Sequence, residues 1–599
     1  MESRQGQAGA PVPGEPGRVS LLPLGIGHPE APSPVRRVAD TLWQGRGELA
    51  ASLDLLVNGV CEGCCLGPRG LADDAAPGMH ICERRLEGLA AHTAEPVVPA
   101  DVIDAARLRG RPTAEREALG RIVQPFRWRR AERGYQAVSW AQAFEELRPR
   151  LREAAPEASA ALLRPAGGSL ETFAAASALW MGSERVFLAR EEGVSAAQRA
   201  LASRLGDEAA SCSLVDLAEA DLILLVGIDP GRSHPDLLRL IERARRRGAR
   251  VLALAPDRLP ESEQAWTLGS VKSALFGSRL IDDLVLLRPR ADGELLQAVL
   301  RRLDERGELQ GRGSEQRADG LPQLREALAA LDPAALREAC AVDPARVDWI
   351  AELLCRARTV VSVVGAGLCR EPLSAARAMA ALAHLHLGLG LLGRPGCGIL
   401  PLFEDEGERG ARELGLGGDA QRLADALSAR PHRLLLTIGD DPLGALRQPG
   451  PLLLAMAGLP LAVHLTGRVQ ELHLQPLAEE TWLLPLQSRY TQEGGALVAT
   501  VERRLRYSPE IGGLPVGEAL PGWSVLAELD RLARGAPRGS GDPPSLQDLR
   551  RRLPELQPAW RGVEGLDSEG DHLQRDGRLL FTAGFPAMPG GRARFHVEP

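Results

Sequence analysis

The sequence lacks the marks of a membrane or exported protein. No apolar run reaches the roughly 20 residues that a membrane-spanning helix needs. The first residues do not show the basic-then-apolar order of a signal peptide. Arg36 and Arg37 precede Val-Ala-Asp rather than a hydrophobic core, which argues against a twin-arginine export signal. We therefore predict a cytoplasmic protein without a membrane partner.

An excess of positive charge is also missing. The 599 residues carry a formal net charge of -7, and the isoelectric point is near 6.0, which argues against a nucleic-acid partner. Arginine is used almost to the exclusion of lysine, which we interpret as codon bias. We find no internal repeat. The length is sufficient for several domains, each with its own core.

Residues 220–256 have the pattern of a strand, a loop, a helix and a second strand. Leu222–Val226 is a short apolar run of the kind found in buried parallel strands, and Gly227 ends it. Pro235 opens a stretch with apolar residues at helical spacing, and 251–255 is the next strand. The loop between strand and helix presents backbone N–H groups near a positive helix end, which favours a phosphate ligand.

This loop resembles the pterin-dinucleotide segment of the molybdopterin oxidoreductase family, in which Gly-x-Asn-Pro is followed by His-Pro. Gly227, Pro230, His234 and Pro235 match that pattern. Asp229 replaces the usual Asn, which keeps a hydrogen-bond acceptor but removes an amide donor. The resemblance is to the subgroup related to formate dehydrogenase alpha subunits, and it covers about residues 50–599.

Further blocks follow in the order of the family. They are 164–187, which resembles the Gly-rich loop and helix under the pterin, and then 270–280, 287–303, 360–367, 390–402, 437–446, 490–506 and 591–595. The resemblance implies an α/β fold with two Rossmann-like parallel-sheet domains and a small N-terminal cysteine-containing domain.

The predicted domains follow from these blocks. Residues 1–40 are expected to be a disordered N-terminus and 41–115 a cysteine domain that could hold an iron–sulfur cluster. Residues 116–190 and 350–533 form the first α/β domain, 191–349 an inserted Rossmann-like domain, and 534–599 a linker and C-terminal tail.

The resemblance also implies the cofactor and the residues that bind it. The cofactor would be a molybdenum-bis(molybdopterin guanine dinucleotide). Asp229 and His234 would meet its phosphates and guanine, Asp257 and Asp292 would lie near the guanine, and Glu493 and Gly494 would border the pterin. The predicted cofactor-binding residues are Gly227, Asp229, His234, Asp257, Asp292, Gly365, Gly439, Glu493 and Gly494.

A cysteine loop is the second functional signal. Cys61 and Cys64 form a Cys-x-x-Cys pair, which in a reducing compartment favours a metal or redox role. The family resemblance implies that Cys61, Cys64 and Cys82 hold an iron–sulfur cluster of the 4Fe-4S kind. A fourth ligand is missing unless Cys65 serves. The alternative is a zinc-like or empty structural loop.

The sequence departs from its relatives where a catalytic centre is expected. No Cys stands between Arg190 and Cys212, where catalytic members place a Cys or selenocysteine ligand to molybdenum, and Ser195 is the nearest oxygen donor. Residues 403–418 replace a loop rich in His and Asn. The chain also ends shortly after 591–595, where relatives continue into a C-terminal barrel domain. No catalytic residue is therefore assigned.

These observations predict a molybdopterin oxidoreductase with a small-molecule substrate, for which formate is a candidate. An electron-transfer partner, or a chain that supplies the missing C-terminal domain, is expected. The alternative is a non-catalytic paralogue that acts as a scaffold or accessory subunit. The sequence leaves open the substrate, the electron acceptor, the choice between molybdenum and tungsten, and the oligomeric state.

Overall fold

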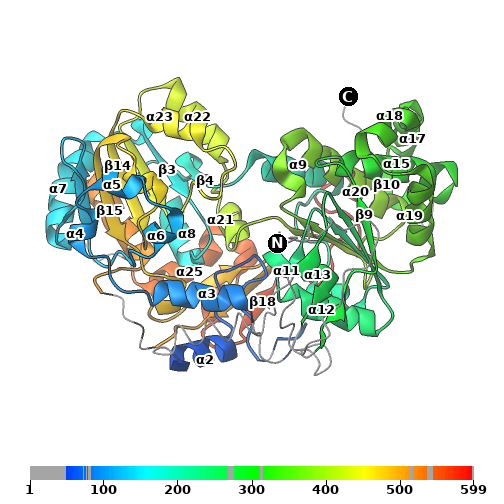
Figure 1. The fold of residues 1–599 in the computed structure, drawn as a ribbon, viewed down its shortest axis with the longest axis horizontal. Coiled ribbons are helices and arrows are strands. Elements are labelled where there is room, and N and C mark those ends of the chain that lie inside the picture. The colour runs from blue at the N-terminus through cyan, green and yellow to red at the C-terminus, as the bar shows by residue number, and fades with distance from the viewer. Residues whose placement is uncertain are drawn as a thin grey trace, which may run out of the picture.

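Two lobes lie side by side, and each is built on a sheet of mainly parallel strands (Figure 1). The computed structural model describes residues 49–596, except Ala72, Ala76, 78–81, 267–275, 310–313, Gly513, 515–516 and 536–543. The predicted disordered segment 1–40 and most of the block 270–280 lie outside the described residues. The predicted α/β class is confirmed. None of the helices in the described part is long and apolar enough to cross a membrane.

The first lobe contains a seven-stranded sheet. Its order is β2 (Gln136–Ala137), β1 (Phe126–Arg129), β15 (Ala478–Pro485), β14 (Leu459–Thr466), β13 (Leu434–Ile438), β3 (Ser159–Leu163) and β4 (Val186–Leu188). The five strands from β15 to β4 are parallel, and β1 pairs antiparallel with β15. Strands β3 and β13 are buried on both faces, as their continuous apolar sequences require.

Helices cover both faces of this sheet. One face packs against α7 (Trp140–Glu153), α8 (Leu170–Ser177), α24 (Gly522–Ala533) and α25 (Leu546–Leu556). The other packs against α22 (Ala420–Ala429) and α23 (Gly450–Met456). Ser139 caps α7 by accepting a hydrogen bond from the Gln142 N–H.

The second lobe contains a parallel sheet of five strands. Its order is β12 (Gly398–Leu402), β11 (Val360–Gly365), β5 (Leu222–Val226), β6 (Arg250–Ala255) and β9 (Asp283–Leu286). Alternate residues of β5 face opposite cores. One core contains α9 (Glu192–Leu205), α15 (Asp292–Glu305), α19 (Pro344–Arg356) and α20 (Pro372–Gly388), and the other contains α10 (Leu214–Glu219) and α12 (Leu237–Arg246).

The strand–loop–helix–strand pattern at 220–256 is thus present, with one difference in detail. A short helix, α11 (Pro230–Ser233), occupies the loop, and the main helix α12 begins at Leu237 instead of near Pro235.

The inserted lobe extends further than the predicted boundary at residue 349. Strands β11 and β12 and helix α20 all belong to it, because β11 pairs in parallel with β5, with Val360 opposite Leu222. The chain therefore returns to the first lobe after Leu402, at α21 (Glu408–Glu413). Sequence order alone did not reveal that β11 lies beside β5.

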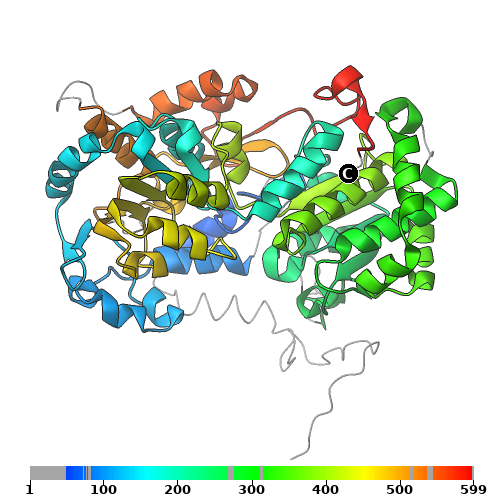
Figure 2. The same cartoon turned by 90° about the horizontal axis from the view of Figure 1, so that it is seen from above.

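The segment predicted to be a linker and tail is folded onto both lobes. Helix α25 packs against α8, and β18 (His572–Gln574) pairs with β17 (Arg504–Ser508), which also pairs with β16 (Ala496–Ala499). Strand β19 (Ala593–Arg594) then pairs with β10 (Ala318–Asp319) in the second lobe. Figure 2 shows this last, red segment against the green lobe.

The N-terminal segment consists of short helices beside the two lobes. They are α2 (Leu49–Asn58), α3 (Glu83–His92), α4 (Pro99–Val102), α5 (Ala105–Arg109) and α6 (Thr113–Glu117). The cysteine loop connects α2 to α3. The remaining elements of the second lobe are α13 (Pro260–Glu263), β7 (Gln264–Ala265), β8 (Ser278–Arg279), α16 (Ser314–Arg317), α17 (Leu321–Ala330) and α18 (Pro333–Cys340).

Candidate functional site

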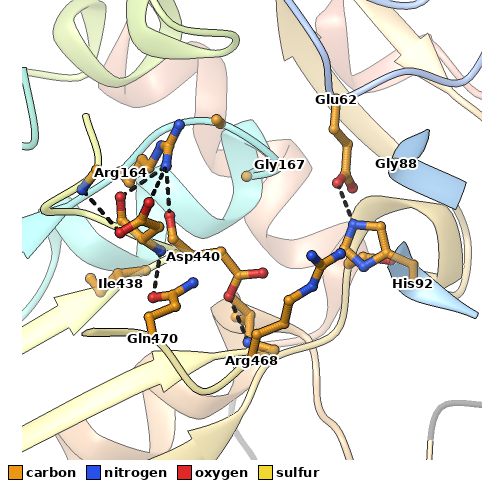
Figure 3. Close-up of a pocket in the computed structure, with 18 of the residues that line it drawn as sticks. Glu62, Gly88, His92, Arg164, Gly167, Ile438, Asp440, Arg468 and Gln470 are labelled. Carbon is orange, nitrogen blue, oxygen red and sulfur yellow. Dashed lines mark hydrogen bonds and ion pairs between the residues drawn. The ribbon is translucent and has the colours of Figure 1, made fainter. Parts of the chain in front are cut away.

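A cavity of about 660 Å³ lies at the carboxyl edge of the first-lobe sheet (Figure 3). Residues that directly follow four parallel strands line it: Arg164 after β3, Gly439 after β13, Gly467 after β14 and Leu486 after β15. Ligands of parallel α/β sheets bind at this edge. The N-terminal segment forms another wall of the cavity, with Glu62, Arg84, His92 and Arg116.

Two glycines shape the backbone before α8, and their N–H groups donate to Glu406 at 3.3 Å and to the Pro165 oxygen at 2.9 Å. Gly167 has a φ of +77°, and a Cβ at Gly168 would lie 2.6 Å from the Phe173 ring, so this loop has no room for a side chain at Gly168. Ser169 caps the helix by accepting a hydrogen bond from the Thr172 N–H at 3.2 Å. The loop and the positive end of α8 both line the cavity.

Charged side chains surround the same space. The Arg164 guanidinium donates to the backbone oxygens of Asp440 and Asp441, at 3.2 and 2.8 Å. Oδ1 of Asp440 accepts from the Gly467 N–H at 2.7 Å. Arg468 extends into the cavity, and its guanidinium makes no hydrogen bond or ion pair with any described residue (Figure 3). The cavity thus offers an arginine that forms no ion pair within the described part of the chain.

Glu62 and His92 form a partly buried pair at the wall. Glu62 accepts from His92 Nε2 at 2.9 Å and from the Arg489 N–H at 2.7 Å (Figure 3). Burial raises the pKa of Glu62, but His92 and Arg489 outweigh this and hold the pKa below its ordinary value. Glu62 is therefore a carboxylate that fixes the imidazole in place.

Three polar groups at the cavity lack partners. Gln487 Oε1, Ser488 Oγ and Tyr490 OH line it, are buried, and form no hydrogen bond with any described residue. A buried polar atom without a partner costs about 1–3 kcal/mol. These side chains can therefore donate hydrogen bonds to a polar ligand and accept them from it.

The predicted loop after β5 lies in the other lobe, away from this cavity. Asp229 accepts a short hydrogen bond from the Ser262 hydroxyl, and Gly227 has a φ of +58°. His234 is only 6% exposed, and its Nε2 lies 3.5 Å from the Cys65 Sγ. Burial and Arg84 lower the pKa of His234 to about 3, so its ring is neutral at physiological pH.

Most other predicted cofactor residues are also outside the cavity. Asp257 is exposed after β6, and Asp292 is buried at the start of α15, where burial raises its pKa to about 6. Gly365 ends β11 in the second lobe. Glu493 and Gly494 are exposed and do not line the cavity. Gly439 is the member of the predicted set that does line it.

The sequence reasoning missed several residues of the cavity. The Gly-rich segment 164–169 was recognised as a cofactor loop, but no single residue in it was assigned. The pattern did not identify Glu62, His92, Arg468, Gln487, Ser488 or Tyr490, because their roles depend on contacts between distant segments. The strand-end position of Gln487 and Ser488 is the signal that could have found them.

The three predicted metal-binding cysteines line one small cavity. Cys61, Cys64 and Cys82 surround a space of about 10 Å³ together with Arg85 and Asp236. Burial raises the pKa of Cys64 and raises that of Cys82 to about 12. In the described part of the chain, no group of three or more His, Cys, Asp or Glu side chains is arranged to hold a metal ion. The iron–sulfur cluster stays a prediction.

A buried network occupies the region where a metal-ligating residue was sought. Arg190 donates to Gln198 at 2.7 Å and to Glu408 at 3.0 Å, and Gln198 donates to Glu404 at 2.6 Å. Burial raises the pKa of Glu404 to about 8. Ser195 donates to Asp419 at 3.1 Å, away from the cavity.

Comparisons with known proteins agree with this fold. Residues 121–271 match the family model "Molybdopterin oxidoreductase". The solved structure of acetylene hydratase from Pelobacter acetylenicus is similar with a TM-score of 0.63, at 14% identity, over 89% of this chain and 76% of that chain. At this identity, the structural likeness shows the fold alone.

Curated relatives are distant and longer than this chain. "Probable oxidoreductase YjgC" of Bacillus subtilis is 25% identical over 422 residues, which are 64% of this chain and 40% of the relative. "Protein YdeP" of Escherichia coli K12 is 22% identical over 65% of this chain and 56% of its own length. The "F420-dependent formate dehydrogenase subunit alpha" of Methanocaldococcus jannaschii is 20% identical, over 62% and 55%. The chain thus spans about half the length of these relatives.

Proposed function

We propose that this chain, a distant member of the molybdopterin oxidoreductase family, binds a molybdenum–pterin cofactor in the first-lobe cavity and serves in the two-electron oxidation or reduction of a small molecule. The family match and the relatives named as oxidoreductases support an enzyme. Formate is the candidate substrate, on the similarity to a formate dehydrogenase subunit.

The unpartnered groups at the cavity carry the proposal. A pterin ring presents both donors and acceptors at its edge, and Gln487, Ser488 and Tyr490 offer the complementary atoms. The Arg468 guanidinium suits its phosphate. The cavity volume also lies in the range of about 300–1,000 Å³ that small ligands occupy. The residues present therefore fit such a group.

Asp440 supports the guanine dinucleotide form of the cofactor. Its carboxylate follows β13, lines the cavity and is fixed by bonds to Oδ1 from the Gly467 N–H and the Thr466 hydroxyl, at 2.7 and 2.8 Å. A carboxylate can accept the paired N–H donors of a guanine edge. The family resemblance implies two such dinucleotides on one molybdenum.

The cofactor, when bound, would supply the metal that exchanges the two electrons. The chain's own residues orient it and handle protons. Because the Glu62 carboxylate only accepts, His92 Nε2 must donate, which leaves His92 Nδ1 as the atom that can take up a proton. An electron-transfer partner is part of this proposal.

A second function is favoured by the network around Arg190. Arg190, Gln198 and Glu404 are bonded to one another or to Glu408, and the described residues from 190 to 211 include no cysteine. On this alternative, the chain is a non-catalytic paralogue that binds cofactor as a scaffold or accessory subunit. Dye-linked formate oxidation by the metal-loaded chain distinguishes the two: turnover on the order of 10 per second supports the enzyme.

The binding proposal is tested by purifying the full chain from a host that makes molybdenum cofactor. Molybdenum, tungsten and pterin are measured per chain. Arg468→Glu is expected to lower pterin content at least tenfold, because it reverses the charge that faces the phosphate. Arg133→Glu is the matched control, since Arg133 is 87% exposed on the same lobe. A wild-type protein without pterin, or equal loss in both variants, contradicts the proposal.

A further inference from the structure

We propose that the chain carries one pterin dinucleotide, at the first-lobe edge, and that the loop after β5 is a structural clamp for the cysteine loop. The inference rests on the proposed function and departs from the two-dinucleotide arrangement that the resemblance implies. Each sheet reverses its order at one point, between β3 and β13 in the first lobe and between β5 and β11 in the second. Ligands of such sheets bind in the crevice at this point.

The crevice between β5 and β11 is filled by backbone. The Gly367 N–H donates to the Gly227 oxygen at 2.9 Å. A Cβ at Gly227 would lie 2.5 Å from the Leu368 nitrogen, and one at Gly365 would lie 2.5 Å from the Ile228 Cβ. The loops after the two strands are therefore in direct contact, where a ligand would have to enter.

The N–H groups of the β5 loop are also occupied. Gly231 donates to the Ser262 hydroxyl at 2.9 Å. Arg232 and Ser233 donate to the Asp229 oxygen at 3.2 and 3.0 Å, and His234 donates to the Pro230 oxygen at 2.9 Å. A phosphate site needs such groups to be free. This loop has satisfied them internally.

The β5 loop carries charge of both signs, because Asp229 and Arg232 both belong to it. Asp229 places a carboxyl group there, and its pKa is raised because it is buried. At the first-lobe edge the corresponding space faces the Arg468 guanidinium. Arg468 gives the first-lobe edge a positive group for an anionic ligand, beside the carboxylates of Glu62, Asp440, Asp441 and Glu471 that also line the cavity.

The same loop makes contacts that give it another role. His234 Nε2 lies 3.5 Å from the Cys65 Sγ, and the Arg232 oxygen accepts from the Arg84 guanidinium at 3.0 Å. Pro235 and Asp236 form part of the wall around Cys61, Cys64 and Cys82. The segment that carries the dinucleotide pattern thus contacts the cysteine loop at Cys65 and the start of α3 at Arg84.

One polar atom at the second-lobe sheet needs a direct test. Asp292 Oδ1 is buried and has no hydrogen-bond partner among the described residues. Asp292 opens α15 after β9, and β6 lies between β9 and β5 in the sheet. It is therefore two strands away from the crevice, and we assign it no dinucleotide.

The experiment counts cofactor in the full chain, purified from a host with active cofactor synthesis. Pterin is oxidised to its fluorescent product, guanine nucleotide is released by acid, and both are divided by protein concentration. One of each per chain is expected. Two of each overturns the inference and leaves the proposed function standing. A protein without pterin contradicts the proposed function, and the inference fails with it.

The pterin content of single-residue variants shows which lobe holds the dinucleotide. Asp229→Ala, Ser262→Ala and Asp292→Asn should leave one pterin per chain, whereas Arg468→Glu should remove at least nine-tenths of it. Pterin lost from the first three and kept in the last overturns the inference. Because Ser262 is buried, each count is made on protein that elutes as a folded species and keeps its far-ultraviolet circular dichroism.

Discussion

The two sheet edges of this protein have the same topology and different contents. In the first lobe the strands beside the reversal, β3 and β13, remain paired up to the Arg164 N–H, which donates to the Ile438 oxygen at 2.8 Å. Beyond that bond a cavity of about 660 Å³ opens. In the second lobe the corresponding loops meet through Gly227 and Gly367. A reversal in strand order therefore permits a ligand site without ensuring one.

Glycine residues have opposite effects at the carboxyl edges of the two sheets. Gly167 and Gly168 keep side chains out of a loop that lines the cavity. Gly365 and Gly367 allow two backbone segments to approach each other, which closes the crevice. The presence of glycines after a strand thus indicates close approach, and the rest of the fold decides whether a ligand or another loop approaches.

The largest expected loss of stability comes from removing a buried ion pair beside the first-lobe cavity. Arg489 and Glu406 form an ion pair with side-chain exposures of 0% and 1%. Glu406→Leu leaves the Arg489 charge buried without its partner, which should cost about 3–5 kcal/mol. The measurement is chemical denaturation followed by circular dichroism. Glu305→Ala is the control, because Glu305 is 43% exposed in its pair with Arg301 and should cost no more than about 1 kcal/mol. Equal losses of unfolding free energy in the two variants would show that the Arg489–Glu406 pair does not stabilise the first-lobe cavity.

A pair of glycine substitutions tests the difference between the carboxyl edges of the two sheets. Gly439→Ala places a Cβ 2.6 Å from the Arg164 oxygen at a φ of +96°, and Gly227→Ala places one 2.5 Å from the Leu368 nitrogen at +58°. The left-handed backbone alone costs about 1–2 kcal/mol for alanine. Both variants should therefore melt at lower temperature, but only Gly439→Ala should lose pterin.

Gly458→Ala is the control for backbone strain, since φ is +90° and no atom lies within 4 Å of the added Cβ. It should be the least destabilised of the three. Pterin loss in Gly227→Ala that equals the loss in Gly439→Ala would remove the distinction between the edges.

A pH effect is expected from the loop between the lobes. Burial raises the pKa of Glu404 from 4.5 to about 8. A raised carboxyl pKa stabilises the fold below pH 4.5, and this contribution is lost as pH rises toward 8, because in that range the unfolded state ionises the carboxyl while the folded state keeps it protonated. Glu404→Gln should therefore gain melting temperature relative to wild type from pH 5 to pH 8, with no further gain above.

Glu305→Gln is the control for this series. Its ion pairs lower the pKa of Glu305, so its contribution changes below pH 4.5 and should be constant from pH 5 to pH 9. A Glu404→Gln difference that is equally constant would mean that Glu404 is ionised throughout.

The smallest effect on the fold is expected at the cysteine loop. If Cys61, Cys64 and Cys82 hold a metal or cluster, anaerobically purified protein should contain iron with sulfide, or zinc, and Cys64→Ser should lower that content. Cys355→Ser is a matched control from a half-buried helical position. Equal metal content in the wild type, Cys64→Ser and Cys355→Ser would mean that the cysteine loop has a structural role only. The β5 loop would then contact a cysteine loop that binds no metal.

Much of the fold was predictable because it follows from local pattern. Strands β5 and β6 are continuous apolar runs, and their prediction at 222–226 and 251–255 agrees with the structure to within a residue. The domain boundary was wrong because β11 pairs with β5 across more than a hundred residues. The glycine pattern also could not show whether Gly227 faces a ligand or Gly367.

The site itself was predicted only in part. Gly439 was identified from its loop pattern and lines the cavity. Tyr490 and His92 have no motif of their own, and their relation to Glu62 arises where α3, the cysteine loop and the segment after β15 converge. Such convergence is a property of the folded chain that spacing along the sequence does not contain.

One feature of the cysteine loop has a mechanical consequence. Cys61 faces the small cavity and the next residue, Glu62, faces the large one. Their Cα atoms are separated by a single peptide unit, about 3.8 Å. A change in the backbone at Cys61 would therefore reach, through one peptide unit, the residue whose carboxylate holds His92. The two cavities thus share one stretch of backbone.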